Sequence, residues 1–283
     1  FCAIPGIRGR YRSRTVTSVV QEAEALLQRG IRELNLVSQD TTGYGRDWKD
    51  GTNLPGLIHQ LGRLGGTFWI RLLYGYPTGV TDALLDAMAE TPQVCHYLDV
   101  PIQHSHPDVL ASMKRGGTVT SLGNMAFRIR RAMPDAAIRT TCLVGFPGET
   151  EEHVRHLEEF LRCAAFDHVG VFVYSPEEGT PAFSLGPGVD ADEAEARRTR
   201  LLEVQRAVVD RKLEARIGTT GEVLLENPLD GGAQCWAARN RYQAPEVDGC
   251  VRVSGIKARK PAGQIVTVRY TVAAGYDLHA VGQ

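Results

Sequence analysis

The sequence lacks the features of a membrane, secreted or strongly charged protein. It has no apolar run long enough to cross a bilayer and no signal-peptide pattern at its start. Its 32 basic and 33 acidic side chains give a formal net charge of −1. That balance argues against a general nucleic-acid binder, although it leaves room for a local basic patch. We therefore expect a cytoplasmic protein with no membrane partner.

Closely spaced cysteines are also missing. The six cysteines are scattered through the sequence, and a chain of 283 residues can bury a full core without disulfides. We expect most of them to be small buried hydrophobic residues in a reducing compartment.

Two kinds of ligand site lack their motifs. The glycine-rich segment 145–149 has no Lys-Ser/Thr pair, which excludes a P-loop for nucleoside triphosphates. The histidines His104, His106, His153 and His156 show no metal-ligand spacing beside an acidic or cysteine partner. We expect no zinc site, and we expect His153 and His156 on a helix surface.

The order of elements indicates two domains of different architecture. Short apolar strands alternate with amphipathic helices over the first two-thirds, which predicts a parallel sheet, either open or closed into a barrel. From Thr219 onward, apolar and polar residues alternate between turns, which predicts a small antiparallel β-barrel. Three strand segments are expected there, at 221–227 (GEVLLEN), 249–255 (GCVRVSG) and 264–272 (QIVTVRYTV). The predicted domains are a core over 1–217, including a connecting helix over 190–216, and a second domain over 218–283. The core strands are expected at 31–37, 67–74, 97–101, 137–144 and 168–174, and helices at 17–29, 81–90 and 149–163.

Polar residues gather directly after these predicted strands. Because the carboxyl ends of parallel strands meet at one edge of a sheet, such loops can build a shared active site. Taken singly, each loop could equally be an ordinary turn that caps the next helix. Several loops on one predicted face favour a shared site, and they are 38–40, 75–77, 103–104, 145–149 and 175–178.

Cys2 gains meaning from its neighbours, since a lone cysteine is usually a core residue. The segment 1–5 (FCAIP), followed by Arg8-Gly9 and Ser13-Arg14, resembles the end of the cluster loop in radical S-adenosylmethionine enzymes of the methylthiotransferase family. The family pattern is Cys-x-x-x-Cys-x-x-Cys. The resemblance implies that Cys2 is the third thiolate ligand of a 4Fe-4S cluster, whose other two ligands precede Phe1, and that S-adenosylmethionine binds the open iron.

Further motifs of this family follow in the expected order over nearly the whole chain. The resemblance implies a partial parallel (β/α) TIM-like barrel of the radical SAM type, followed by a TRAM domain, the small β-barrel that recurs in the family. The motifs are 36–45 (LVSQDTTGYG), 71–78 (RLLYGYPT), 97–104 (YLDVPIQH), 110–115 (LASMKR), 139–149 (RTTCLVGFPGE) and 174–182 (YSPEEGTPA).

Two short segments indicate a branch within the family. Ser38-Gln39-Asp40 and Ile102-Gln103-His104 are similar to the branch that β-methylthiolates an aspartate of small-subunit ribosomal protein twelve. A tRNA adenosine methylthiotransferase is the first alternative, and a non-catalytic α/β barrel with Cys2 as a bystander is the second. The resemblance also implies a second 4Fe-4S cluster, in an N-terminal domain that this sequence does not represent.

The resemblance implies four residues that bind S-adenosylmethionine, while no catalytic residue can be singled out. Gln103 would form a hydrogen bond with the ribose or the methionine end of S-adenosylmethionine, or else cap a helix. Arg139 would pair with its carboxylate, or else form a structural ion pair with a neighbouring helix. Leu143 would line the adenine, although a core role is the more common one for a strand leucine. Tyr174 would stack on the adenine or merely seal the barrel rim.

The charge of the second domain bears on the substrate. Residues 218–283 hold seven basic and six acidic side chains, a weak surplus for gripping RNA phosphates. The basic run 257–260 (KARK) is more often a solvated loop than a binding site. We expect a ribosomal-protein substrate docked through the TRAM-like domain rather than a tRNA, although ribosomal protein twelve is itself basic and lies on RNA. Because the chain holds one thiolate of three, we expect that it does not assemble the cluster alone.

Overall fold

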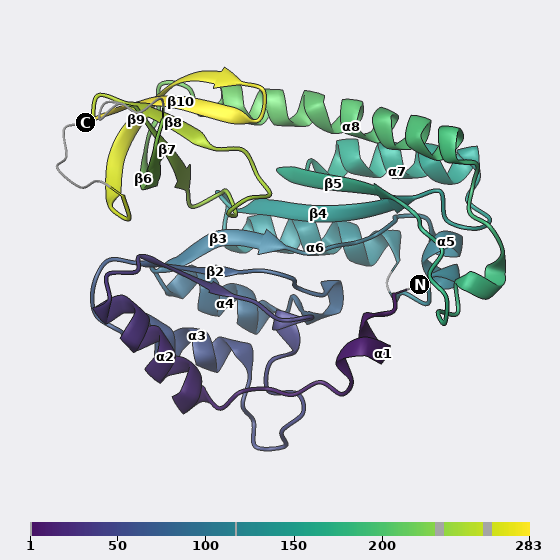
Figure 1. Cartoon of the computed structure of the whole chain (residues 1–283), viewed down its shortest axis with the longest axis horizontal. Helices are drawn as coiled ribbons and strands as arrows, with labels where there is room; N and C mark the ends of the chain where they lie inside the picture. The colour runs from purple at the N-terminus through teal and green to yellow at the C-terminus, as the bar shows by residue number, and fades with distance from the viewer. Residues whose placement is uncertain (1, 117, 230–234, 257–261) are drawn as a thin grey trace.

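The computed structural model describes residues 2–116, 118–229, 235–256 and 262–283, and it contains two sheets (Figure 1). The basic run 257–260 lies outside the described residues. The first sheet is wholly parallel with the order β1-β2-β3-β4-β5, which confirms the predicted parallel core. Its strands are β1 Glu33–Leu36, β2 Trp69–Leu72, β3 Val94–Asp99, β4 Ala137–Val144 and β5 His168–Val173.

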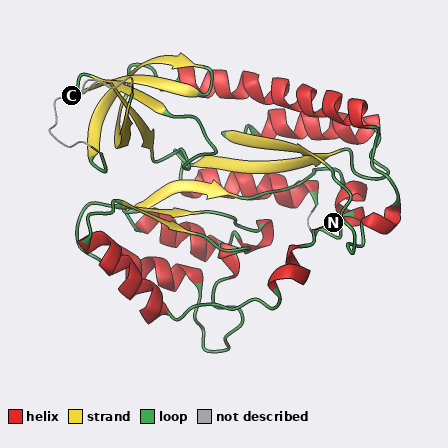
Figure 2. Ribbon diagram, viewed as in Figure 1, coloured by secondary structure: helices red, strands yellow, loops and turns green. Residues whose placement is uncertain are grey.

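Helices connect these strands and cover one face of the sheet (Figure 2). Side-chain caps set where several of them begin, because a threonine or aspartate oxygen accepts a bond from a free backbone amide of the first turn. Thr150, for example, caps α7 through the amide of His153. No helix among the described residues has the length and apolarity to span a membrane. The helices are α1 Ile4–Arg8, α2 Val16–Gln28, α3 Leu54–Gly62, α4 Asp82–Glu90, α5 Pro107–Ser112, α6 Val119–Ala132, α7 Glu151–Ala164 and α8 Ala191–Glu214, with short 3-10 turns η1 Thr41–Gly43, η2 Pro77–Gly79 and η3 Phe183–Leu185.

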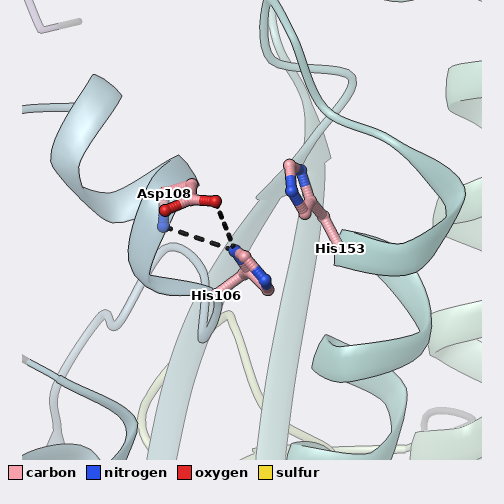
Figure 3. A group of neighbouring side chains, drawn as sticks. All are labelled: His106, Asp108 and His153. Atoms are coloured by element: carbon pink, nitrogen blue, oxygen red, sulfur yellow. Dashed lines mark hydrogen bonds and ion pairs between the residues drawn. The ribbon is translucent and has the colours of Figure 1, made fainter.

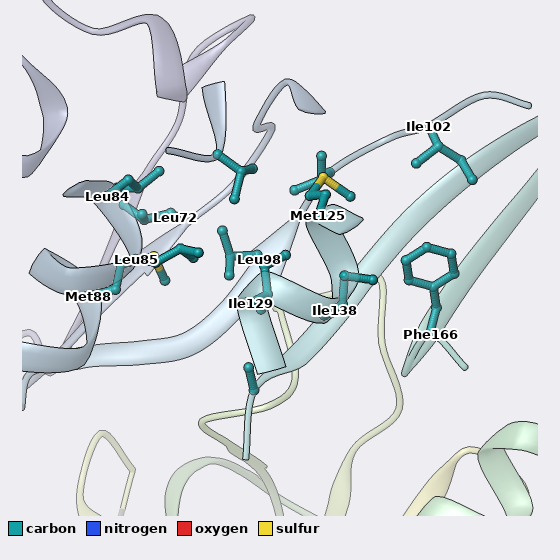
Figure 4. Close-up of a cluster of buried hydrophobic side chains, with 14 of the residues drawn as sticks. Leu72, Leu84, Leu85, Met88, Leu98, Ile102, Met125, Ile129, Ile138 and Phe166 are labelled. Carbon is teal, nitrogen blue, oxygen red and sulfur yellow. The ribbon is translucent and has the colours of Figure 1, made fainter. Parts of the chain in front are cut away.

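The main core lies between the parallel sheet and its helices. Along β4, burial alternates, so that Ile138, Cys142 and Val144 join the apolar core while Arg139 and Leu143 lie on the other face. Figure 4 shows leucine and methionine side chains of α4 packed beside residues from the strands and α6. This core holds the strand ends in fixed positions.

The second domain is a closed five-stranded barrel with the order β10-β8-β7-β6-β9. Alternation predicted three of its strands; the structure adds β7 and β10. It also differs from the expected antiparallel barrel at one seam, because β10 pairs with β8 in parallel. The strands are β6 Thr220–Pro228, β7 Cys235–Asn240, β8 Val251–Ser254, β9 Ile265–Ala274 and β10 Asp277–Gly282.

The second domain packs against the amino ends of the parallel strands, and α8 runs along the core to reach it (Figure 1). An apolar cluster joins the domains, in which Trp69, Tyr97 and Ala137 of the sheet meet Leu224 and Ala244. Ion pairs between charged side chains also join the two domains. The barrel therefore closes the amino edge of the sheet and leaves the carboxyl edge free.

Candidate active site

The loops that the sequence predicts as a shared site do lie at one edge. All five strands are parallel, so the segments after Leu36, Leu72, Asp99, Val144 and Val173 gather at the carboxyl edge of the sheet. In Figure 1 the N-terminus lies near α5, on the side of the molecule opposite the barrel. This edge holds the candidate active site.

Two residues of this edge adopt the left-handed backbone region. Tyr74 has a φ of 59° and Gln103 a φ of 70°, and neither is a glycine. Main-chain bonds hold Gln103 in place, since its amide donates to the Thr141 carbonyl over 2.8 Å and its carbonyl accepts from the Leu143 amide over 2.7 Å. Such backbone costs about 1–3 kcal/mol and concentrates at functional sites. Sequence reasoning singled out Gln103 but missed Tyr74, although it recognised the surrounding motif.

A cavity of about 890 Å³ opens beside β1 and is large enough for a small-molecule cofactor. Cys2, Ser38, Tyr76 and Arg115 are among its lining residues. Cys2 is exposed there. Gln103, Leu143 and Tyr174 do not line this cavity, so the edge carries two neighbouring regions rather than one pocket.

Arg115 connects the cavity to the loop after β3. Its guanidinium donates to the carbonyl of Pro101 and lies 4.8 Å over the ring of Tyr76. Burial lowers the pKa of Arg115, while nearby Tyr76 and Cys2 act in the opposite direction. A fixed cation therefore faces the cavity close to the Cys2 thiol, and sequence reasoning assigned it no role.

Glu149 fixes the glycine-rich loop that follows β4. Its carboxylate accepts from the Gly145 amide over 2.9 Å and pairs with Arg197 of α8 over 2.8 Å. Its second oxygen lies 3.7 Å from Nε2 of His104, and both side chains are fully buried. Burial and the neighbouring histidines lower the pKa of His104 to about 3, while burial raises the pKa of Glu149. The motif glutamate thus joins two strand-end loops to α8.

Tyr174 and Leu143, two of the predicted cofactor-binding residues, lie together at this edge. Tyr174 follows β5 and its ring lies 5.0 Å from that of Phe146 in a T-shaped contact, in a small cluster against which Leu143 packs. The Tyr174 hydroxyl is buried and has no hydrogen-bond partner among the described residues. An apolar wall with one free hydroxyl suits a ligand that has both an apolar face and polar edges.

Arg139 does not join this group. It lies near the start of β4, and its side chain pairs with Asp248 of the second domain over 2.6 Å and approaches Asp99 at 3.9 Å. Burial lowers the pKa of Arg139, but Asp248, Tyr97 and Asp99 outweigh it and leave the pKa raised. The sequence offered a structural ion pair as the alternative role. The structure has that pair, with its partner on a loop of the barrel rather than on a helix.

The exposure and pKa of each cysteine indicate which thiols could bind an iron–sulfur cluster. Among the described thiols, Cys2 is the one that lines the cavity. Burial raises the pKa of Cys95 to about 11 and that of Cys142 to about 12, so both stay protonated thiols. An exposed thiol beside a cavity and a fixed cation fits one ligand of a cluster, and clusters of this kind take several thiolates.

Comparison with known proteins adds two family matches. The profile of the radical SAM superfamily matches residues 1–161, which is more than half of the chain, and that of the TRAM domain matches residues 217–281. Among solved structures, coproporphyrinogen III oxidase (HemN) from Escherichia coli aligns with a TM-score of 0.49 and 12% identity, over 82% of this chain and 62% of that chain.

Several similar proteins in other organisms have the name ribosomal protein uS12 methylthiotransferase RimO. The protein of Synechococcus elongatus (strain ATCC 33912 / PCC 7942 / FACHB-805) is 46% identical over 281 residues, covering 99% of this chain and 61% of the relative. That of Syntrophus aciditrophicus (strain SB) is 44% identical over 280 residues, covering 99% and 62%. The chain thus spans about three-fifths of the length of these relatives.

Proposed function

The chain belongs to the radical SAM superfamily, and on that premise we propose that it is part of a RimO-type enzyme that β-methylthiolates an aspartate of ribosomal protein uS12. One observation carries the proposal: relatives of that name are 42–46% identical over nearly the full chain, across both domains. The similarity therefore includes the carboxyl-edge loops and the barrel together. A ribosomal substrate is also the ground for a cytoplasmic location.

In this proposal Cys2 supplies one thiolate of the radical-generating 4Fe-4S cluster, and the family pattern requires two more before Phe1. When bound, the cluster supplies the electron that cleaves S-adenosylmethionine. Arg115 holds positive charge beside the thiolate, since it is fixed by the Pro101 carbonyl and the Tyr76 ring. A second 4Fe-4S cluster would belong to an N-terminal domain, as the family resemblance implies.

The residues of the carboxyl edge would hold S-adenosylmethionine. Gln103 offers its side-chain amide, and its backbone is held by hydrogen bonds of both its N–H and its carbonyl. Leu143 and Tyr174 offer an apolar wall. The free Tyr174 hydroxyl supports this role, because a buried hydroxyl without a partner costs free energy that a ligand can recover. Arg139 is left out of the cofactor set, because Asp248 already pairs with its guanidinium.

The substrate would dock through the second domain. Its seven basic and six acidic residues give little excess charge for gripping RNA, which favours a protein over a tRNA. Buried ion pairs join the barrel to the core. A protein bound to the barrel would therefore have a fixed position relative to the carboxyl edge.

The test uses the full-length enzyme, reconstituted anaerobically with iron and sulfide. It is incubated with S-adenosylmethionine and either a peptide of ribosomal protein uS12 or tRNA, and the products are weighed. We expect a methylthio mass increase on an aspartate of the peptide and none on tRNA. An increase on a tRNA adenosine with none on the peptide would overturn the proposal in favour of a tRNA methylthiotransferase.

A further inference from the structure

A second cluster of chemically active side chains lies outside the carboxyl-edge site, on the outer surface between α5 and α7. His106 is the N-cap residue of α5, Asp108 lies in its first turn, and His153 lies in the first turn of α7. Figure 3 shows His153 reaching from α7 toward the pair at the start of α5. One nitrogen or oxygen atom of each residue lies within 4.8 Å of such an atom of the other two.

We propose that His106, Asp108 and His153 form a surface site for a divalent transition metal ion of the zinc class. Two imidazoles and a carboxylate are a donor set that such ions favour, with water in the remaining position. Sequence spacing predicted no zinc site, because these three residues come from two segments that are far apart in the chain and meet only in the fold.

The two rings are already held near each other. Their centroids are 4.2 Å apart with 34° between the planes. Backbone amides orient both rings: the Asp108 amide donates to Nδ1 of His106 over 3.3 Å and the Thr150 amide to Nδ1 of His153 over 3.2 Å. These hydrogen bonds are long and therefore weak, so little free energy is lost if metal binding rotates a ring and breaks one of them. His156 supports the site from the side, since its ring meets that of His106 at 5.1 Å and its Nδ1 contacts the Ser105 hydroxyl.

Rotation of the Asp108 side chain can bring its carboxylate within bonding distance of a metal ion at this site. Zinc bonds of about 2.0–2.2 Å place the ligand atoms of a tetrahedron roughly 3.3–3.6 Å apart. The cluster therefore has to tighten from its present spread. The side chain of Asp108 is 80% exposed and free to rotate, whereas that of His106 is 18% exposed and fixed at the cap of α5.

The site has a consequence for the loop after β3. The backbone amide of His106 donates to Nδ1 of His104 over 2.9 Å, and His104 directly follows Gln103. An ion that ties His106 to α7 would therefore stiffen the loop that carries Gln103. The site itself does not depend on the activity proposed above, because none of its ligands belongs to the cluster or cofactor set.

The test is zinc binding by the 283-residue chain, freed of metal by a chelator and followed by titration calorimetry. All proteins carry Cys2→Ala and Cys163→Ala, because exposed thiols also bind zinc. We expect one zinc ion per chain, and at least about tenfold weaker binding after His106→Ala or His153→Ala. His59→Ala is the matched control, since His59 is an exposed helix histidine remote from the site in sequence.

Cobalt adds a readout of the ligands themselves. Bound Co²⁺ should show visible bands of nitrogen and oxygen coordination, which His106→Ala removes and His59→Ala keeps. Circular dichroism of the metal-free proteins checks folding. If His153→Ala unfolds because His153 belongs to the capping box of α7, His106→Ala and Asp108→Asn carry the test. Equal zinc affinity in His106→Ala and His59→Ala, or no zinc binding by the parent, would overturn the proposal.

Discussion

The two edges of the parallel sheet differ in how they hold buried ionisable groups. Among uncharged groups there is no such contrast, because Trp69 Nε1 and Gln93 Oε1 at the amino edge also have no hydrogen-bond partner among the described residues. At the amino edge, charges are paired across the two domains: Glu33 bonds Arg71 and Arg239 over 2.6 Å each, and Arg139 bonds Asp248. At the carboxyl edge, buried titratable groups keep an atom without a hydrogen-bond partner among the described residues. These are Asp99, His104, Glu149 and Tyr174.

This difference separates stability from function. Buried polar groups in proteins are normally bonded, so unbonded ones call for an explanation such as a ligand site. Left-handed Tyr74 and Gln103 lie at the same carboxyl edge. In parallel barrels the carboxyl edge carries the chemistry and the amino edge the stability.

Replacing Glu33 should have the largest effect on stability. Glu33→Ala leaves Arg71 and Arg239, both nearly fully buried, without the carboxylate that they share. We expect a loss of about 3–5 kcal/mol in the free energy of unfolding, measured by urea denaturation. Asp210→Ala breaks an exposed pair with Arg206 and should cost at most about 1 kcal/mol. Equal losses in the two variants would refute a structural role for the amino edge.

Removing one hydroxyl at each edge gives a matched comparison. Tyr97 donates to Asp248 over 2.7 Å, whereas the Tyr174 hydroxyl has no bond among the described residues. Tyr97→Phe should lower the free energy of unfolding by about 1–3 kcal/mol. Tyr174→Phe should leave it unchanged or raise it, because the change removes a buried hydroxyl that has no bond to lose. Thermal unfolding followed by calorimetry would decide, and a larger cost for Tyr174→Phe would contradict the account.

Acid should weaken the amino edge through Glu33. Burial alone would raise the pKa of Glu33, but bonds and charge from Arg239 and Arg71 outweigh it and leave the pKa below its ordinary 4.5. The stability that this carboxylate adds is therefore complete above pH 4.5 and is lost as the pH falls through the lowered value. Urea unfolding between pH 6 and pH 3 should show a steeper loss in the parent than in Glu33→Gln. Parallel pH profiles would count against the pairing.

Relieving the backbone at Gln103 should have only a small effect on stability. Glycine adopts a φ of 70° without strain, so Gln103→Gly should raise the free energy of unfolding by no more than about 1 kcal/mol. The same change removes the amide proposed to bind S-adenosylmethionine. Equilibrium dialysis with the reconstituted full-length enzyme should therefore show weaker binding. Unchanged affinity would remove Gln103 from the cofactor set.

Local patterns predicted most of the fold. The bounds of β4 match the prediction, and α4 begins one residue after its expected start because Thr81 is its cap. What local patterns do not reveal depends on contacts between distant residues. Arg139 has the chemistry of a cofactor ligand, and no local pattern shows that its guanidinium pairs with Asp248, far along the chain. No local pattern reveals that His106 meets His153, or that β10 closes its barrel beside β8 in parallel.

The central claim is that Cys2, at the carboxyl edge, binds the cluster that cleaves S-adenosylmethionine. The most direct measurement compares Cys2→Ala with Cys163→Ala, a second exposed cysteine on α7, in the anaerobically reconstituted full-length enzyme. Iron content and formation of 5′-deoxyadenosine are recorded for both. We expect Cys2→Ala to abolish the cleavage and Cys163→Ala to retain it. Cleavage by Cys2→Ala at the rate of Cys163→Ala would contradict it.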